Sequence, residues 1–155
     1  MPVASSGNVW LITGCSTGIG RALARALLAR GEAVVATARD RALLADLDPA
    51  NSGRLLALDL DVTRPETIER ARDAALGWRG GVDVLVNNAG YGLVGAAEEI
   101  SDEQALAAFE TNVFGVHRMV RAFLPAMRER GRGHIVNVSS MLGHVGAAGF
   151  SFYAA

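Results

Sequence analysis

The sequence has no lysine, so all 15 of its basic residues are arginines. Sixteen acidic residues balance them, which leaves a formal net charge of −1 at pH 7. A chain without excess positive charge lacks the electrostatic surface that binds nucleic acid or an anionic membrane. We therefore expect neither of these partners.

Cysteine and long apolar runs are also scarce. Cys15 is the single cysteine, so an intramolecular disulfide is excluded. Polar or charged residues interrupt every apolar run before it reaches the roughly 20 residues that a membrane-spanning helix needs. The opening stretch, MPVASSGN, lacks the basic and apolar regions of a secretion signal. These absences favour a cytoplasmic protein.

Histidine and cysteine, the usual ligands of zinc, are scarce. The three histidines, His117, His134 and His144, do not have the spacing of metal ligands, so we expect no metal site. Cys15 lies where a helix is expected to begin, which could activate a thiol, but a small side chain that fills space explains it as well.

Short apolar runs alternate with longer amphipathic segments along the whole chain. A chain of 155 residues, half of them hydrophobic, is long enough for one core, and we expect a single domain over residues 1–155. The apolar runs have the length and bounds of buried parallel strands. They are residues 9–13, 33–38, 54–60, 82–88 and 134–140.

Helical periodicity is clear in two of the segments between these predicted strands. Apolar residues recur every three or four positions over residues 18–30, and Gly31 ends that pattern. Ser101, with Gln104 three residues later, indicates a capped helix start. One long helix should follow and bury a single stripe, formed by Phe109, Val113, Val116, Val120, Phe123 and Met127. This helix is also a candidate contact between subunits of a homo-oligomer.

The alternation predicts the fold class. Strands and helices should follow one another as β-α-β-α-β-α-β-α-β, with the first residues of a further helix at the end of the chain. This order is typical of an α/β protein with a Rossmann-like, doubly wound parallel sheet between two helical layers.

A glycine-rich turn, TGCSTGIG, connects the first strand to the first helix. Glycines at such a turn let backbone approach a pyrophosphate, whose charge the helix amino end attracts. The glycines are spaced G-x-x-x-G-x-G, which differs from the G-x-G-x-x-G of the general dinucleotide motif. The turn is not a P-loop either, because Arg21 follows Gly20 where a P-loop has a lysine. A tight turn without a ligand therefore remains an alternative.

The end of the second strand, ATARD, indicates which nucleotide this turn would bind. Dinucleotide sites often hold the ribose 2′-hydroxyl with an acidic residue about 20 positions beyond the glycines. Ala38 offers no carboxylate there, and the guanidinium of Arg39 suits a 2′-phosphate. The pattern favours NADP(H), although Arg39 could also be an ordinary exposed arginine.

Four stretches in the expected order resemble the short-chain dehydrogenases/reductases. They are TGCSTGIG, NNAG at 87–90, TNVFG at 111–115 and IVNVSS at 135–140. The resemblance runs from Val9 to Ala155 and implies an NADP(H)-dependent oxidoreductase acting on a small carbonyl or alcohol. The implied cofactor-binding residues are Gly14, Ser16, Thr17, Gly18, Ile19, Gly20, Arg39, Asp61, Val62, Asn88, Ala89 and Gly90. Asn87 would mainly brace the central strands.

The same resemblance implies three catalytic residues. Tyr153 would be the acid/base that exchanges a proton with the substrate oxygen, Ser140 would hydrogen-bond that oxygen, and Asn112 would hold a water in the proton relay. A segment of small and apolar residues, 141–150, would form one wall of the substrate pocket and favour a lipophilic substrate.

The family's lysine lies four residues after the tyrosine, which corresponds to position 157. We therefore expect that the sequence is truncated after the fifth strand and is the N-terminal part of a longer domain. The fifth strand would then be an unpaired edge. Two other functions remain open at this point: a non-catalytic NADP(H)-binding or interaction module, and a phosphate-binding regulator of flavodoxin-like topology.

Overall fold

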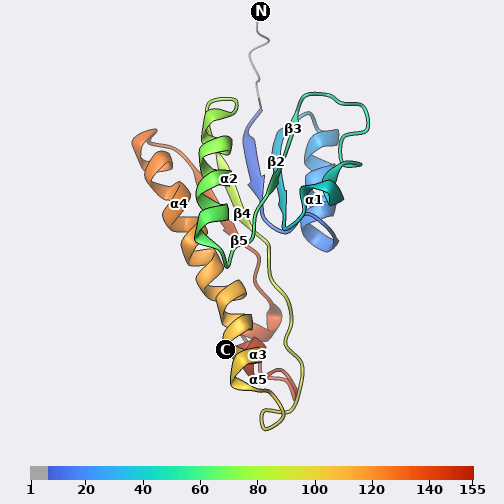
Figure 1. Cartoon of the computed structure of the whole chain (residues 1–155), viewed down its shortest axis with the longest axis vertical. Helices are drawn as coiled ribbons and strands as arrows, with labels where there is room; N and C mark the ends of the chain where they lie inside the picture. Colours follow the sequence, from blue (N-terminus) through green and yellow to red (C-terminus); the bar gives the residue numbers. More distant parts are fainter. Residues whose placement is uncertain (1–6) are drawn as a thin grey trace, which may run out of the picture.

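A computed structural model describes residues 7–155 (Figure 1). Most of the opening stretch used in the secretion-signal argument lies outside these residues. The elements in chain order are β1 (Val9–Ile12), α1 (Gly18–Ala29), β2 (Ala33–Ala38), η1 (Arg41–Leu44), β3 (Leu55–Asp59), α2 (Pro65–Gly77), β4 (Val84–Asn87), α3 (Asp102–Phe109), η2 (Glu110–Gly115), α4 (Val116–Glu129), β5 (His134–Asn137), η3 (Met141–Gly143) and α5 (Ser151–Ala154). In this part of the chain, no helix is long and apolar enough to cross a bilayer.

The five strands form one parallel sheet, as predicted, in the order β3-β2-β1-β4-β5. Leu11 of β1 pairs with Val35 on one side and with Leu85 on the other. From β1 the chain adds β2 and then β3 on one side of the sheet. It then crosses to the other side of β1, where it adds β4 and β5. Such a reversal opens a crevice at the carboxyl ends of the two strands, where ligands of doubly wound folds bind.

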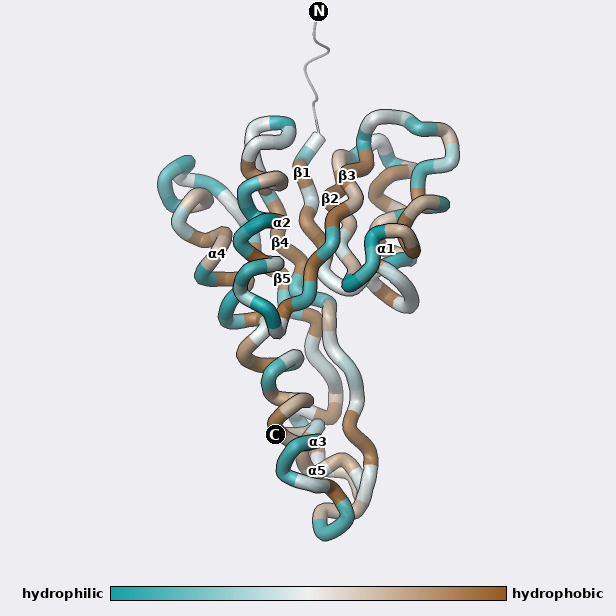
Figure 2. Tube along the Cα trace, in the orientation of Figure 1, coloured by the Kyte–Doolittle hydropathy of each residue, from teal (hydrophilic) through white to brown (hydrophobic). Residues whose placement is uncertain are grey.

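Helices cover both faces of the sheet. Figure 1 shows α2 and α4 on one face and α1 on the other. Phe123 and Met119 of α4 are fully buried against the first face, and Leu27 of α1 packs against the second. Figure 2 shows hydrophobic residues along the strands and hydrophilic residues alternating with hydrophobic ones along the helices. The predicted three-layer arrangement is therefore correct.

The prediction of a helix between β2 and β3 is wrong. This crossover contains only the four-residue 3₁₀ turn η1. Three turn-forming residues follow it: Asp48, Asn51 and Gly53. Asn51 and Gly53 adopt positive φ angles of 48° and 72°. The carboxylate of Asp48 accepts a hydrogen bond from the backbone N–H of Ser52 at 2.8 Å. Turn-forming residues at this density leave too few consecutive positions for an α-helix.

The long helix begins as predicted but is not regular. Its capping box is complete, since Ser101 Oγ accepts from Gln104 N at 3.3 Å and Gln104 Oε1 accepts from Ser101 N at 2.9 Å. The π-helical segment η2 then separates α3 from α4. A π turn inserts one extra residue per turn and rotates the following helix face. Val113, expected in the buried stripe, lies within η2 and is 47% exposed, and Met119, which was not expected in the stripe, is buried.

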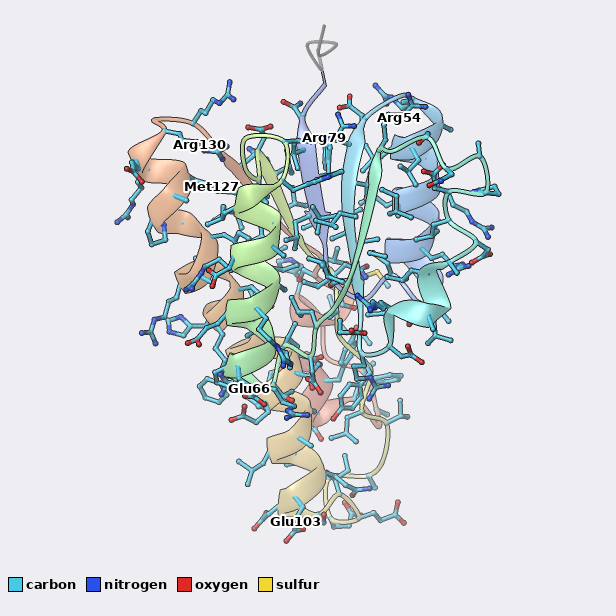
Figure 3. All side chains as sticks on the ribbon, turned by 45° about the horizontal axis from the view of Figure 1, so that its top comes forward. Arg54, Glu66, Arg79, Glu103, Met127 and Arg130 are labelled. Atoms are coloured by element: carbon cyan, nitrogen blue, oxygen red, sulfur yellow. The ribbon has the colours of Figure 1, made fainter. Side chains whose placement is uncertain are left out.

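The two ends of the sheet differ in character. Figure 3 places Arg54, Arg79 and Arg130 near the amino ends of the strands and Glu103 at the far end of the molecule. Arg130 Nη1 donates to the carbonyl oxygen of Gly80 at 2.9 Å, which ties the end of α4 to the sheet. Arg130 thus has a structural role near the amino ends of the strands, and the carboxyl ends carry the candidate site.

Candidate functional site at the carboxyl ends of the strands

The glycine-rich turn follows β1 and requires its glycines. Gly14 and Gly18 have φ angles of +73° and +61°, which strain residues that carry a Cβ. Gly20 is needed for space, because a Cβ there would lie 2.6 Å from the carbonyl oxygen of Gly14 and would collide with the side chain of Asn88. The turn is therefore folded tightly against the residues that follow β4.

The amino end of α1 lies open above this turn. Its N-cap residue, Thr17, makes no side-chain hydrogen bond to the helix within the described residues, and the first turn contains no acidic side chain. Thr17, Gly18 and Ile19 are exposed, Ile19 to 67%. A twelve-residue helix that leaves its first N–H groups free is a suitable binding site for an anion such as a pyrophosphate.

Thr13 connects the glycine turn to the segment after β4, a role that the sequence analysis missed. This residue is buried, and its Oγ1 accepts from Asn88 N at 3.0 Å and from Ala89 N at 2.9 Å. Asn88 Nδ2 returns a bond to the carbonyl oxygen of Thr13 at 2.8 Å. A polar residue at the end of an apolar strand was the available signal. Together these bonds hold Asn88, Ala89 and Gly90 beside the amino end of α1.

Asn87 braces the sheet, as predicted. Its side chain is 3% exposed, and Nδ2 donates to Asn137 Oδ1 at 2.8 Å across the pair formed by β4 and β5. This bond fixes the spacing of the two strands that lead to the candidate catalytic residues.

The ends of β2 and β3 supply the residues expected around the adenosine. Arg39 is exposed and has no ion pair or hydrogen bond among residues 7–155, while Ala38 before it is buried. Asp61 Oδ1 accepts from Thr63 N at 2.9 Å, which holds the carboxylate in place. Val62 is 6% exposed and packs on Gly115, so little of its side chain is left to contact a ligand.

Asn112 lies within the π-helical segment η2 and faces the loop after β4. Its Oδ1 accepts from Tyr91 N at 3.1 Å, and its Nδ2 donates to Tyr91 O at 2.8 Å. The amide thus binds both backbone groups of one residue and joins η2 to the NNAG segment. One amide hydrogen and one lone pair remain for another partner, such as a water.

Ser140 and Tyr153 lie on neighbouring elements. Ser140 caps η3 and accepts from Leu142 N at 3.2 Å, which leaves its hydroxyl hydrogen free to donate. Tyr153 belongs to α5, which packs beside η3, and its ring lies 6.2 Å from that of Phe150 between centroids. The two hydroxyl groups make no hydrogen bond to each other within the part of the chain that the structure describes.

Cys15 fills space beneath the turn. Its side chain is fully buried, and Sγ donates to the carbonyl oxygen of Ile12 at 3.3 Å. Burial raises the pKa of this thiol to about 11, against the smaller opposing effects of a hydrogen bond from Thr37 and of the Arg21 charge. At neutral pH the residue is therefore a protonated, inaccessible thiol, not a nucleophile.

This arrangement, an open helix end above a glycine turn at the reversal of strand order, is typical of a dinucleotide site. The family model for short chain dehydrogenases matches residues 8–155. The chain belongs to the short-chain dehydrogenase family. It spans about half the length of the curated relatives it matches.

Individual members of the family agree with this assignment. The oxidoreductase calM of Penicillium decumbens is 41% identical, over 96% of this chain and 51% of its own. A short-chain dehydrogenase structure from Streptomyces avermitilis is 49% identical with a TM-score of 0.91, over 96% of this chain and 55% of its own. An alcohol dehydrogenase structure from Thermococcus sibiricus, solved with 5-hydroxy-NADP, is 33% identical with a TM-score of 0.88, over 96% of this chain and 64% of its own.

Proposed function

We propose that the protein transfers a hydride between NADP(H) and a carbonyl or secondary alcohol group of a small molecule. The observation that carries this proposal is the open amino end of α1, held beside Asn88 by the contacts of Gly20. The strand order β3-β2-β1-β4-β5 is that of the dinucleotide-binding fold and differs from the flavodoxin-like order 2-1-3-4-5. Membership of the short-chain dehydrogenase family supports the same reaction class.

The residues around this helix end fit a dinucleotide. The free N–H groups of Thr17, Gly18 and Ile19 would bind the pyrophosphate, with Gly14, Ser16 and Gly20 shaping the turn. Asn88, Ala89 and Gly90 would support a ribose through their backbone, and Asp61 and the backbone of Val62 would flank the adenine. When bound, the nicotinamide would supply or accept the hydride.

The protein's own part in the reaction would be to move and hold a proton. Tyr153 would donate a proton to the substrate oxygen during reduction and remove it during oxidation. Ser140 would donate its free hydroxyl hydrogen to the same oxygen and stabilise the negative charge that develops there. Asn112, whose amide has one hydrogen and one lone pair unused, would hold a water that renews the proton on Tyr153.

Arg39 supports NADP(H) over NAD(H). Its guanidinium is exposed at the end of β2, it has no partner in the described part of the chain, and a planar guanidinium matches the oxygens of a phosphate. Ala38 places no carboxylate there that would repel this phosphate. The Thermococcus sibiricus structure, whose ligand is an NADP derivative, shows that a relative accepts such a ligand.

The wall of the substrate pocket would be apolar. Val94, Met141 and Val145 are 65%, 76% and 53% exposed on the loops that follow β4 and β5. Gly95 N donates to the carbonyl oxygen of Gly149 at 2.9 Å, which holds these two loops together. Exposed apolar side chains on paired loops suit a lipophilic substrate.

The cytoplasmic location and a subunit contact through the long helix remain predictions.

The test of the proposal is the Arg39→Ala variant of the whole natural protein. Loss of charge-assisted hydrogen bonds should raise KM for NADPH by about 10- to 100-fold and change KM for NADH little. Arg41→Ala is a matched control, because Arg41 already pairs with Asp59 at 3.7 Å. Equal effects of the Arg39 substitution on both cofactors would contradict the proposal.

A further inference from the structure

Arg21 joins two parts of the chain that the proposed cofactor site needs together. It lies in the first turn of α1, yet its side chain reaches the crossover between β2 and β3. Arg21 Nη1 donates to the carbonyl oxygen of Ser16 at 3.3 Å and to that of Leu43 at 2.9 Å. Its Nη2 pairs with the carboxylate of Asp46. One guanidinium thus connects the glycine turn, η1 and the residues after η1.

The guanidinium is fixed in this position. The side chain of Arg21 is only 20% exposed, although it carries a full charge. Asp46 is the counterion, and the hydrogen bond from Arg21 holds the pKa of that carboxyl below its usual range. Arg25, one helical turn further along, reaches the same carboxylate at 2.8 Å. Within residues 7–155, the Arg25 side chain donates hydrogen bonds to Asp46 alone. Arg21 also donates to the backbone carbonyl oxygens of Ser16 and Leu43.

The bond to Ser16 orients the glycine turn. In a trans peptide the C=O and the following N–H point in opposite directions. Because the carbonyl of Ser16 faces Arg21, the N–H of Thr17 faces away from it. The bond to Leu43 anchors η1, which begins two residues after Arg39. Arg21 therefore positions both the turn and the segment from which Arg39 extends.

We propose that Arg21 is a positioning residue that sets the selectivity of the site for the 2′-phosphate of NADP(H); this inference rests on the proposed function. The other end of the cofactor has separate support. Gly20 packs on Asn88 and on the carbonyl oxygen of Gly14, and Thr13 holds Asn88 and Ala89. Loss of Arg21 should therefore weaken recognition of the 2′-phosphate more than recognition of the 5′-phosphate.

The experiment compares two probes on the whole natural protein by isothermal titration. The probes are 2′,5′-ADP and 5′-AMP, which differ only in the 2′-phosphate. The variants are Arg21→Ala and the matched control Arg25→Ala, each checked for folding by circular dichroism. We expect Arg21→Ala to lower the affinity for 2′,5′-ADP by about tenfold or more and the affinity for 5′-AMP by a smaller factor, so that the preference for 2′,5′-ADP falls below that of Arg25→Ala.

A second variant covers the case in which Arg21→Ala does not fold. Arg21→Lys keeps the charge and the aliphatic stem but lacks the planar fork that spans three partners. It should also lower the preference for 2′,5′-ADP over 5′-AMP. A preference equal to that of the natural protein would overturn the positioning role.

The outcomes separate this inference from the proposed function. If the natural protein does not prefer 2′,5′-ADP to 5′-AMP, the proposed NADP(H) specificity fails. If the natural protein shows the preference and Arg21→Ala retains it as fully as Arg25→Ala, NADP(H) specificity stands and the role of Arg21 is wrong.

Discussion

The side-chain amide of Asn112 binds both backbone groups of Tyr91, at 3.1 Å and 2.8 Å. This pair links the π-helical segment η2 to the loop that follows β4. Tyr91 comes directly after Gly90, at the end of the NNAG segment. The residue proposed to hold a catalytic water therefore also fixes the backbone that would support a cofactor ribose.

Substitution of Asn112 by alanine should reduce both stability and activity. It removes two hydrogen bonds and leaves the backbone of Tyr91 without these partners, which we expect to cost about 1–3 kcal/mol of unfolding free energy. Urea unfolding measures this change. Thr111→Ala is the neighbouring control, because among residues 7–155 the Thr111 hydroxyl donates only to the carbonyl oxygen of Ala107, one turn back in α3. Equal stability losses in the two variants would contradict the linking role.

Gly20→Ala should disrupt the glycine turn. The new Cβ would collide with Asn88 and with the carbonyl oxygen of Gly14, and overpacking of this kind costs about 1–3 kcal/mol. Titration with NADPH should show weaker binding. Gly77→Ala provides the control, since Gly77 is the last residue of α2 and, apart from its chain neighbours and the adjacent helix backbone, no atom of the described residues lies within 4 Å of the added Cβ. That substitution should change stability by no more than about 1 kcal/mol.

Sequence patterns located the strands well and the helical crossovers less well. The five apolar runs correspond to β1 to β5. The inner strands β2 and β4 are buried throughout, as an apolar run predicts, whereas the edge strands β3 and β5 are only partly buried. The crossover between β2 and β3 was expected to be helical, although Asp48, Asn51 and Gly53 favour turns. The regular spacing from Phe109 to Met127 gave no sign of the π turn η2, in which Asn112 binds the backbone of Tyr91 and Gly115 packs on Val62.

The candidate site could be predicted only where its residues are close in sequence. The glycine turn is such a segment, and its context between a strand and a helix was visible. The bonds from Thr13 to Asn88 and from Arg21 to Leu43 join residues 75 and 22 positions apart. Contacts of this kind follow from the strand order and the path of the crossover, which no local pattern specifies.

Tyr153→Phe should lower the turnover rate of the whole protein by at least about 100-fold, since it removes the proposed general acid. The hydroxyl lies outside the residues proposed to bind the nucleotide, so the affinity for NADPH should stay unchanged. Steady-state kinetics and a binding titration on the same preparation measure the two effects. A rate within a few-fold of the natural protein would require a different proton donor.

Cys15 should make stability depend on pH in the alkaline range. Its pKa rises from 9.0 to about 11 on folding, so the folded state retains a proton that the unfolded state releases. This thiol's contribution is complete below pH 9 and decreases as the pH rises toward 11, by about 2–3 kcal/mol in total. Urea unfolding at pH 8 and pH 10.5 measures the change. Cys15→Ala should show a smaller loss, and an identical loss would contradict the assignment.

The central claim is an NADP(H) site at the open amino end of α1, and direct titration of the whole natural protein tests it. Dissociation constants for NADPH and NADH should be measured under the same conditions. We predict that NADPH binds at least about tenfold more tightly, as expected for a charged hydrogen bond to the 2′-phosphate. Equal affinities, tighter binding of NADH, or no binding of either nucleotide would contradict the account.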